Sequence, residues 1–210
     1  MKYIFVAGVP GSKWSSVVKN IYYSTDIDRS DYSDARTYYH DAQGEMQLTH
    51  LGAYFDPGME FGDFFDTINQ ATKSQCEREF NKPFDYPIKQ NQRRIIKSHV
   101  FCNHIDYLKA MWPNSPIVLV HRDDDASLGW WVKCGHFDIT YPLYHEYYRD
   151  LKHMAKIIEQ QNKNLLTAWD KYKGVEVKNN LELSDALDIR RTGNEYFQDY
   201  VKSDIRVKVI

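Results

Sequence analysis

The chain has few cysteines, and those it has are far apart. Cys76, Cys102 and Cys134 are the three cysteines among 210 residues, and no two of them form a CxxC pair. The eight histidines are scattered as well, without the spacing of a zinc site. The pattern excludes a disulfide framework, and it predicts a protein of a reducing compartment with no bound metal.

A long apolar run is also missing. No stretch of the sequence is long enough to cross a membrane. The apolar start of the chain is short and leads into Gly-Pro-Gly rather than into a small-residue cleavage site, which indicates a first strand and not a signal peptide. We therefore expect a cytoplasmic protein without a membrane span.

The charge shows no strong excess of either sign. The formal net charge of −2 argues against a general nucleic-acid binder, although local basic clusters can still bind a compact anion. Apolar residues make up 42% and charged residues 27%, which is typical of a soluble globular protein. With no repeat and no linker, the sequence predicts a single domain over residues 1–210.

What the chain does have is a distinctive beginning. Tyr3 to Val9 is an apolar, β-branched run that predicts a buried strand. Gly8-Val9-Pro10-Gly11-Ser12 predicts a tight turn, and a helix is expected from Trp14 to Tyr23. A strand, a glycine-rich turn and a helix start form a common phosphate-binding unit, to which Lys13 adds a charge. The loop does not fit the Walker pattern, so an ordinary turn with a surface lysine is the alternative.

The rest of the sequence predicts an α/β fold, with a P-loop-like parallel sheet flanked by helices. The segment 24–45 and the aromatic segment 50–59 are expected to be loops, the second pinned to the core by Tyr54 and Phe55. Apolar patterns predict a short strand around Ile95 and Ile96, within the stretch 93–101, and strands over 116–121 and 174–178. Helices are expected over 62–80, 103–112, 126–134 and 142–172, with a last helix after residue 193.

Three basic stretches follow predicted strands or turns. Lys97 and His99 are two residues apart, so on an extended strand they would face the same side. A cation beside a titratable base suits the transfer of a charged group to a hydroxyl, but an ordinary loop histidine is the alternative. Arg122 ends the strand 116–121, on the ligand side of a parallel sheet. The turn Arg190-Arg191-Thr192-Gly193 either grips an anion or is simply solvated.

Taken in order, these stretches resemble the PAPS-dependent sulfotransferases, which use 3′-phosphoadenosine 5′-phosphosulfate (PAPS). Gly8 to Ser16 resembles the 5′-phosphosulfate loop, which reads GVPRSGTT in the tyrosylprotein branch. RIIKSHVF, at 94–101, is similar to RIIKTHLP of the cytosolic branch. VLVHRD, at 118–123, resembles the strand that leads to the 3′-phosphate arginine, and Arg190 to Gly193 is weakly similar to the RKG element.

The chain departs from this pattern at four places. Gly11 stands where the family has its basic loop residue, and Lys13 where a glycine is usual. Trp14 replaces a small hydroxyl residue. The family also has a serine eight places after its 3′-phosphate arginine. Here that place is Trp130, and Ser127 is the nearest serine.

The resemblance implies a sulfotransferase fold and in-line sulfuryl transfer from PAPS to a hydroxyl or amine acceptor of unknown class. The product would be 3′-phosphoadenosine 5′-phosphate (PAP), and no metal is needed. His99 would accept the proton of the acceptor, while Lys97 and Lys13 would neutralise charge on the bridging oxygen. The residues expected to bind the cofactor are Gly11, Ser12, Lys13, Trp14, Ser15, Ser16, Arg122, Ser127, Arg190, Arg191 and Gly193.

Two other functions stay open. GVPGSK lacks one glycine of the kinase-like GVPGSGK, and Asp123 could serve as the carboxylate that holds Mg²⁺ in a P-loop kinase for a nucleotide or small molecule. RIIKSH has no role in that interpretation. The third possibility is a nucleotide-binding protein without catalysis, because a fold does not fix a function.

Overall fold

The fold is an α/β sandwich in a computed structural model that describes residues 1–31, 51–133, 149–192 and 197–210. Its six-stranded sheet has the order β2-β3-β1-β4-β6-β5. The strands are β1 (Tyr3–Gly8), β2 (Ala53–Tyr54), β3 (Arg94–Lys97), β4 (Ile117–His121), β5 (Val175–Val177) and β6 (Arg206–Val209). The first four are parallel, which agrees with the expected α/β class.

The sheet is mixed rather than purely parallel, so the expectation of a parallel sheet is wrong at one edge. β6 runs antiparallel to both β4 and β5. The sequence analysis places a last helix after residue 193, but the described residues there form a short 3₁₀ turn, η5 (Val201–Ser203), and then β6. β6 has four residues and pairs only with segments far away in the chain. Local periodicity is therefore too weak to predict it.

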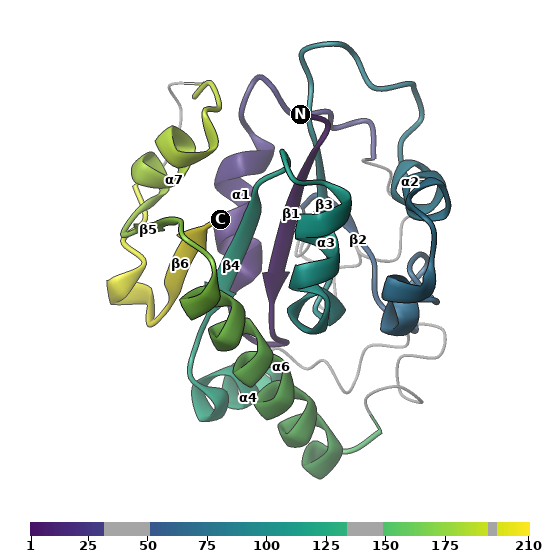
Figure 1. Cartoon of the computed structure of the whole chain (residues 1–210). Coiled ribbons are helices and arrows are strands. Elements are labelled where there is room, and N and C mark those ends of the chain that lie inside the picture. Colours follow the sequence, from purple (N-terminus) through teal and green to yellow (C-terminus); the bar gives the residue numbers. More distant parts are fainter. Residues whose placement is uncertain (32–50, 134–148, 193–196) are drawn as a thin grey trace.

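Helices cover both faces of the sheet. Figure 1 shows α3 (Ile105–Met111) and α6 (Leu151–Lys171) in front of the sheet, with α1 (Trp14–Tyr22) and α7 (Asn180–Leu187) behind it. α4 (Asp124–Lys133) lies below the sheet, beyond the end to which β1 points. No described helix combines the length and apolar character that a membrane crossing requires.

The segment 62–80 is not one helix. It forms a 3₁₀ segment, η2 (Phe65–Gln70), and then α2 (Lys73–Asn81). Thr72 separates the two, because it is extended and caps α2 by accepting a hydrogen bond from the amide of Gln75. The long helix expected over 142–172 is described from Leu151 to Lys171, and residues 142–148 lie outside the described part.

The core explains how the first strand anchors the fold. All six residues of β1 are buried. Tyr3 and Phe5 meet aromatic rings of α2 and of the segment after β3, such as Phe80 and Phe101. On the other face, α1 buries Trp14, Val17, Val18 and Ile21 at helical spacing. Burial on both sides fixes β1, and hence the loop that follows it.

Candidate functional site

The β1–α1 loop is a tight turn pressed against another helix. The amide of Ser12 donates to the carbonyl of Val9 at 3.0 Å. Gly11 has a φ of 78°, and a Cβ there would lie 1.9 Å from the carbonyl oxygen of Ser127 in α4. Only glycine fits at this position, so no basic side chain can stand there. Lys13, two residues after Gly11, adopts a left-handed φ of 62°.

Arg122 and Ser127 both lie beside this loop. Arg122 donates through Nη1 to the carbonyl of Gly11 at 3.2 Å, and the hydroxyl of Ser127 donates to the carbonyl of Arg122 at 3.2 Å. Within the described part of the chain, the buried Nε of Arg122 has no hydrogen-bond partner. A buried donor without a partner costs about 1–3 kcal/mol, so an anion beside Arg122 would relieve a real deficit.

The serines of the loop differ in their surroundings. Ser12 is fully buried, its Oγ lacks a partner among the described residues, and it is turned back toward Gly8. Ser16 donates to the carbonyl of Lys13 at 2.8 Å and accepts from Nε2 of Gln198 at 3.0 Å. Ser15 lies half-buried in the first turn of α1. The hydroxyl of Ser16 is therefore already engaged within the protein.

Three cations surround one indole on the β4 side of the loop. The ring centroid of Trp130 is 4.9 Å from Nζ of Lys13, 5.7 Å from Nζ of Lys133 and 5.8 Å from Cζ of Arg122. Burial and repulsion from Arg122 lower the pKa of Lys13. We call Lys13, Arg122, Trp130 and Lys133 the β4-side cluster. Neighbouring like charges favour a bound anion, and Trp130 stands where the resembling family has a serine.

Lys97 and His99 lie on the other side of the loop and are buried. Lys97 is 0% exposed, and its Nζ donates to the carbonyl of Leu51 at 2.7 Å. His99 is 5% exposed, and its Nδ1 lies 2.5 Å from the carbonyl oxygen of Gly8, at the base of the loop. Trp14 stacks on the imidazole with a centroid separation of 3.9 Å. The loop, Lys97 and His99 are thus brought together.

Burial sets the charge of this pair. It lowers the pKa of Lys97 to about 7, against the opposing effect of Asp31 and Asp56. It lowers the pKa of His99 to about 3, helped by the nearby Lys97 and opposed by the hydrogen bond with Gly8. His99 is therefore neutral at neutral pH. Since a carbonyl only accepts, its Nδ1 carries the hydrogen and its Nε2 carries a free lone pair.

The geometry of His99 differs from the sequence-based expectation. β3 ends at Lys97, and His99 lies in the following turn with helical φ and ψ of −65° and −34°. The assumption that an extended strand puts both residues on one side is therefore wrong. The two side chains meet instead through Trp14, which stacks on His99 and lies 5.6 Å from Nζ of Lys97.

Asp56 is a residue of this site that the sequence analysis missed. It is fully buried, and one carboxylate oxygen accepts from the hydroxyl of Ser98 at 2.6 Å and the amide of His99 at 3.0 Å. The other accepts from the hydroxyl of Tyr54 at 2.6 Å. Burial raises the pKa of Asp56 to about 6, although these donors act in the opposite direction.

Asp56 and the residues around it form a connected group. We call Trp14, Tyr54, Asp56, Lys97, Ser98 and His99 the β3-side network. Tyr54 and Phe55 are buried, as the pinned-loop interpretation of 50–59 expects, but Ala53 and Tyr54 also form the edge strand β2. Aspartate is common in turn-rich segments, so its presence at position 56 does not indicate a site. Only the fold shows which side chains surround it.

The two arginines of the C-terminal turn are not brought to the loop. Arg190 pairs through Nε with Asp26 at 2.9 Å, and Arg191 lies 3.4 Å from Asp185. Asp26 follows the end of α1, whereas the loop precedes its start, and nine helical residues span about 13 Å. Gly193 lies outside the described residues. The chain reaches the loop later, where the carbonyl of Ser203 accepts from Nζ of Lys13 at 3.2 Å.

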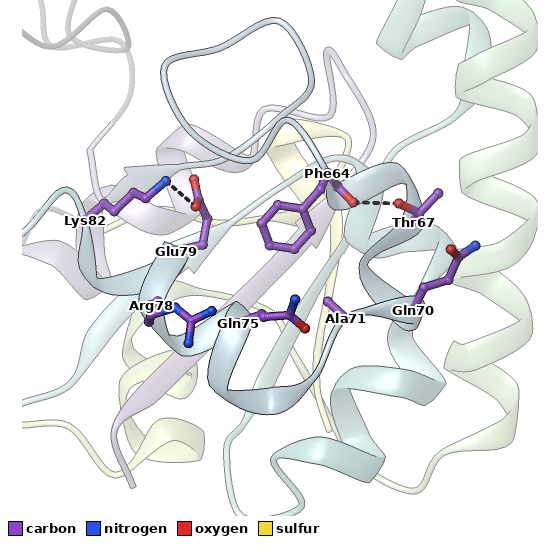
Figure 2. A pocket seen from close by; sticks show the side chains of 8 residues that line it. All are labelled: Phe64, Thr67, Gln70, Ala71, Gln75, Arg78, Glu79 and Lys82. Carbon is purple, nitrogen blue, oxygen red and sulfur yellow. Dashed lines mark hydrogen bonds and ion pairs between the residues drawn. The ribbon is translucent and has the colours of Figure 1, made fainter.

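A separate open cavity of about 490 Å³ lies along η2 and α2. Figure 2 shows its lining, with Lys82 paired to Glu79 and the hydroxyl of Thr67 donating to the carbonyl of Phe64. None of the residues that line it belongs to the predicted site. We therefore treat it as distinct from the carboxyl edge of the sheet.

The described ranges contain no group of three or more His, Cys, Asp or Glu side chains that could hold a metal. Comparisons with protein-family models, with curated proteins and with solved structures found no match.

Proposed function

We propose that this protein transfers the sulfuryl group of PAPS to a hydroxyl or amine acceptor. The observation that carries the proposal is the hydrogen bond between Nδ1 of His99 and the carbonyl of Gly8. It ties the RIIKSH segment to the base of the β1–α1 loop. A base and a lysine then lie directly beside a loop of the phosphate-binding kind, as in-line transfer to a hydroxyl requires.

The loop and the β4-side cluster would hold the nucleotide. Among the described residues, no backbone carbonyl accepts from the amides of Gly11 and Lys13. These amides and the start of α1 favour an anion. Lys13, Arg122 and Lys133 add full charges beside the loop. A nucleotide that carries phosphate on both its 3′ and 5′ positions presents several anions for such a cluster.

The chemistry would take place on the β3 side. The acceptor oxygen attacks sulfur while the bond from sulfur to the bridging phosphate oxygen breaks, and that oxygen leaves with the electron pair as part of PAP. The proton of the acceptor hydroxyl passes to Nε2 of His99, which carries the free lone pair. Lys97, in its ammonium form, neutralises the charge that develops on the leaving oxygen. Trp14 covers the imidazole, so this step requires that the indole be displaced from the ring.

Calorimetric titration tests this proposal, with PAP compared to ATP in the presence and absence of Mg²⁺. We expect PAP to bind without a metal, and its affinity to fall when the 3′-phosphate is removed. A screen of hydroxyl and amine acceptors with PAPS follows. Preference for ATP with Mg²⁺ would overturn the proposal in favour of a kinase, and PAP binding without turnover of any acceptor would indicate a binding protein.

A further inference from the structure

Asp56 is bonded to both residues of the turn that carries His99. It is 0% exposed, and three donors from two different segments converge on its carboxylate. Ser98 and His99 bind one oxygen, and Tyr54 binds the other. Two of these donors lie in the turn that follows β3. The carboxylate therefore fixes the direction in which the chain leaves the strand.

The second oxygen of Asp56 also lies near the base. Its distance to Nε2 of His99 is 3.9 Å, while Nδ1 is held by the carbonyl of Gly8 on the opposite edge of the ring. The imidazole thus has one nitrogen fixed by the β1–α1 loop and the other directed toward a carboxylate. The Gly8 carbonyl, which only accepts, selects the tautomer with the hydrogen on Nδ1 and the lone pair on Nε2. The carboxylate of Asp56, which also only accepts, favours a hydrogen on Nε2 once His99 has taken up a proton.

We propose that Asp56 is a positioning residue for the reaction proposed above, holding the Ser98–His99 turn so that Nδ1 of His99 stays on the carbonyl of Gly8 and Nε2 keeps its lone pair. The inference rests on the proposed function for its catalytic meaning. Asp56 acts through His99. The carboxylate also lies on the side where an imidazolium hydrogen appears once His99 has accepted the proton of the acceptor.

Asp56→Asn tests this role without removing the side chain. The amide oxygen can keep the bonds from Ser98 and from the His99 amide, so the –NH₂ group takes the place of the second oxygen. There it no longer accepts from the hydroxyl of Tyr54, and it cannot accept a hydrogen from an imidazolium at His99. We expect lower thermal stability and unchanged PAP affinity. PAP release from PAPS, with water as the acceptor, should fall roughly ten- to a hundredfold, which is less than the ~10²–10⁴-fold that a general base itself contributes.

A nitrogen-15 spectrum of the imidazole gives a readout that needs no turnover. In the wild type we expect a slowly exchanging hydrogen on Nδ1 and an Nε2 signal typical of a free lone pair. In Asp56→Asn the Nε2 signal should shift, because a neutral amide replaces the negative charge 3.9 Å from it. Asp63→Asn makes the same chemical change at an exposed position nearby and should leave the His99 signals unchanged.

Ser98→Ala is the second variant, because it keeps the charge of Asp56 but removes one donor that holds it. We expect faster exchange of the hydrogen on Nδ1. Unchanged His99 signals in both Asp56→Asn and Ser98→Ala would overturn the inference, and should Asp56→Asn not fold, Ser98→Ala alone decides it. Failure of the wild type to bind PAP would instead overturn the proposed function, while the spectra still decide whether Asp56 positions His99.

Discussion

The two sides of the β1–α1 loop carry similar cationic residues in opposite surroundings. On the β3 side, Lys97 is fully buried, and burial lowers its pKa to about 7. On the β4 side, Lys13 and Lys133 gather around Trp130, whose side chain is 36% exposed. Water screens the charges on the β4 side and is excluded from the β3 side. The difference teaches that the same residue type can serve proton chemistry in one place and anion binding in the other.

The first way to test this comparison is to remove the base. His99→Asn keeps a donor for the carbonyl of Gly8 but loses Nε2. We expect sulfuryl transfer to fall by roughly 10²–10⁴-fold with PAP affinity unchanged, because the nucleotide lies on the β4 side. His153→Ala, at the start of α6, is the control. Wild-type turnover by His99→Asn would remove His99 from its role.

The two tryptophans allow a matched comparison of stability. Trp14 is 3% exposed and stacks on His99, so Trp14→Ala should lower the free energy of unfolding by about 3–5 kcal/mol. Trp130→Ala should change it by no more than about 0.5 kcal/mol, because the ring is partly solvated. Urea denaturation measures both values. Equal losses of unfolding free energy in the two variants would contradict the conclusion that the β3 side is buried and the β4 side is solvated.

The cations of the β4-side cluster should control nucleotide affinity. Arg122→Met keeps much of the apolar side chain and removes the charge. We expect PAP affinity to fall about 10- to 100-fold, which corresponds to the roughly 1.5–3 kcal/mol of a hydrogen bond to a charged group. Lys202→Met removes an exposed charge from η5 and should have little effect. Calorimetry at two salt concentrations should also show a weaker salt dependence for Arg122→Met.

The last test concerns the pH dependence that Lys97 gives to stability. Its pKa is about 7 in the folded protein and near 10.5 when the chain is unfolded. Between these values the unfolded state binds more protons, so this group makes the protein more stable as the pH rises from about 7 toward 10. Urea unfolding of the wild type and of Lys97→Met measures the difference. An identical pH dependence of the two proteins would show that Lys97 is not held in this state.

Some of the site could be anticipated from local patterns. Gly8 to Ser12 predicts a turn because glycine and proline restrict the backbone locally, and the turn is where it was expected. Arg122 follows an apolar run whose burial is evident from composition alone. Because parallel strands end at one edge of a sheet, the meeting of Arg122 with the loop also follows from the predicted fold.

Other parts depend on contacts between distant segments. The sequence suggested that Arg190 could join the loop, but Asp26, 164 residues away in the chain, binds its guanidinium. The last strand, β6, exists because β4 and β5 lie on either side of it. No local periodicity records such pairings, since they require the rest of the fold to be in place.

The sequence by itself determined the strand, turn and helix at the start of the chain. It also determined that Lys97 stands at the end of β3 and that Arg122 follows β4. Those features depend on backbone preference and on alternation of apolar residues, which act over a few neighbours. Only the tertiary structure decided that Asp56 lies at His99, that Trp14 covers the imidazole, and that Lys97 is buried while Lys13 is not. Burial and long-range hydrogen bonds set these environments, and both arise only when distant segments pack together.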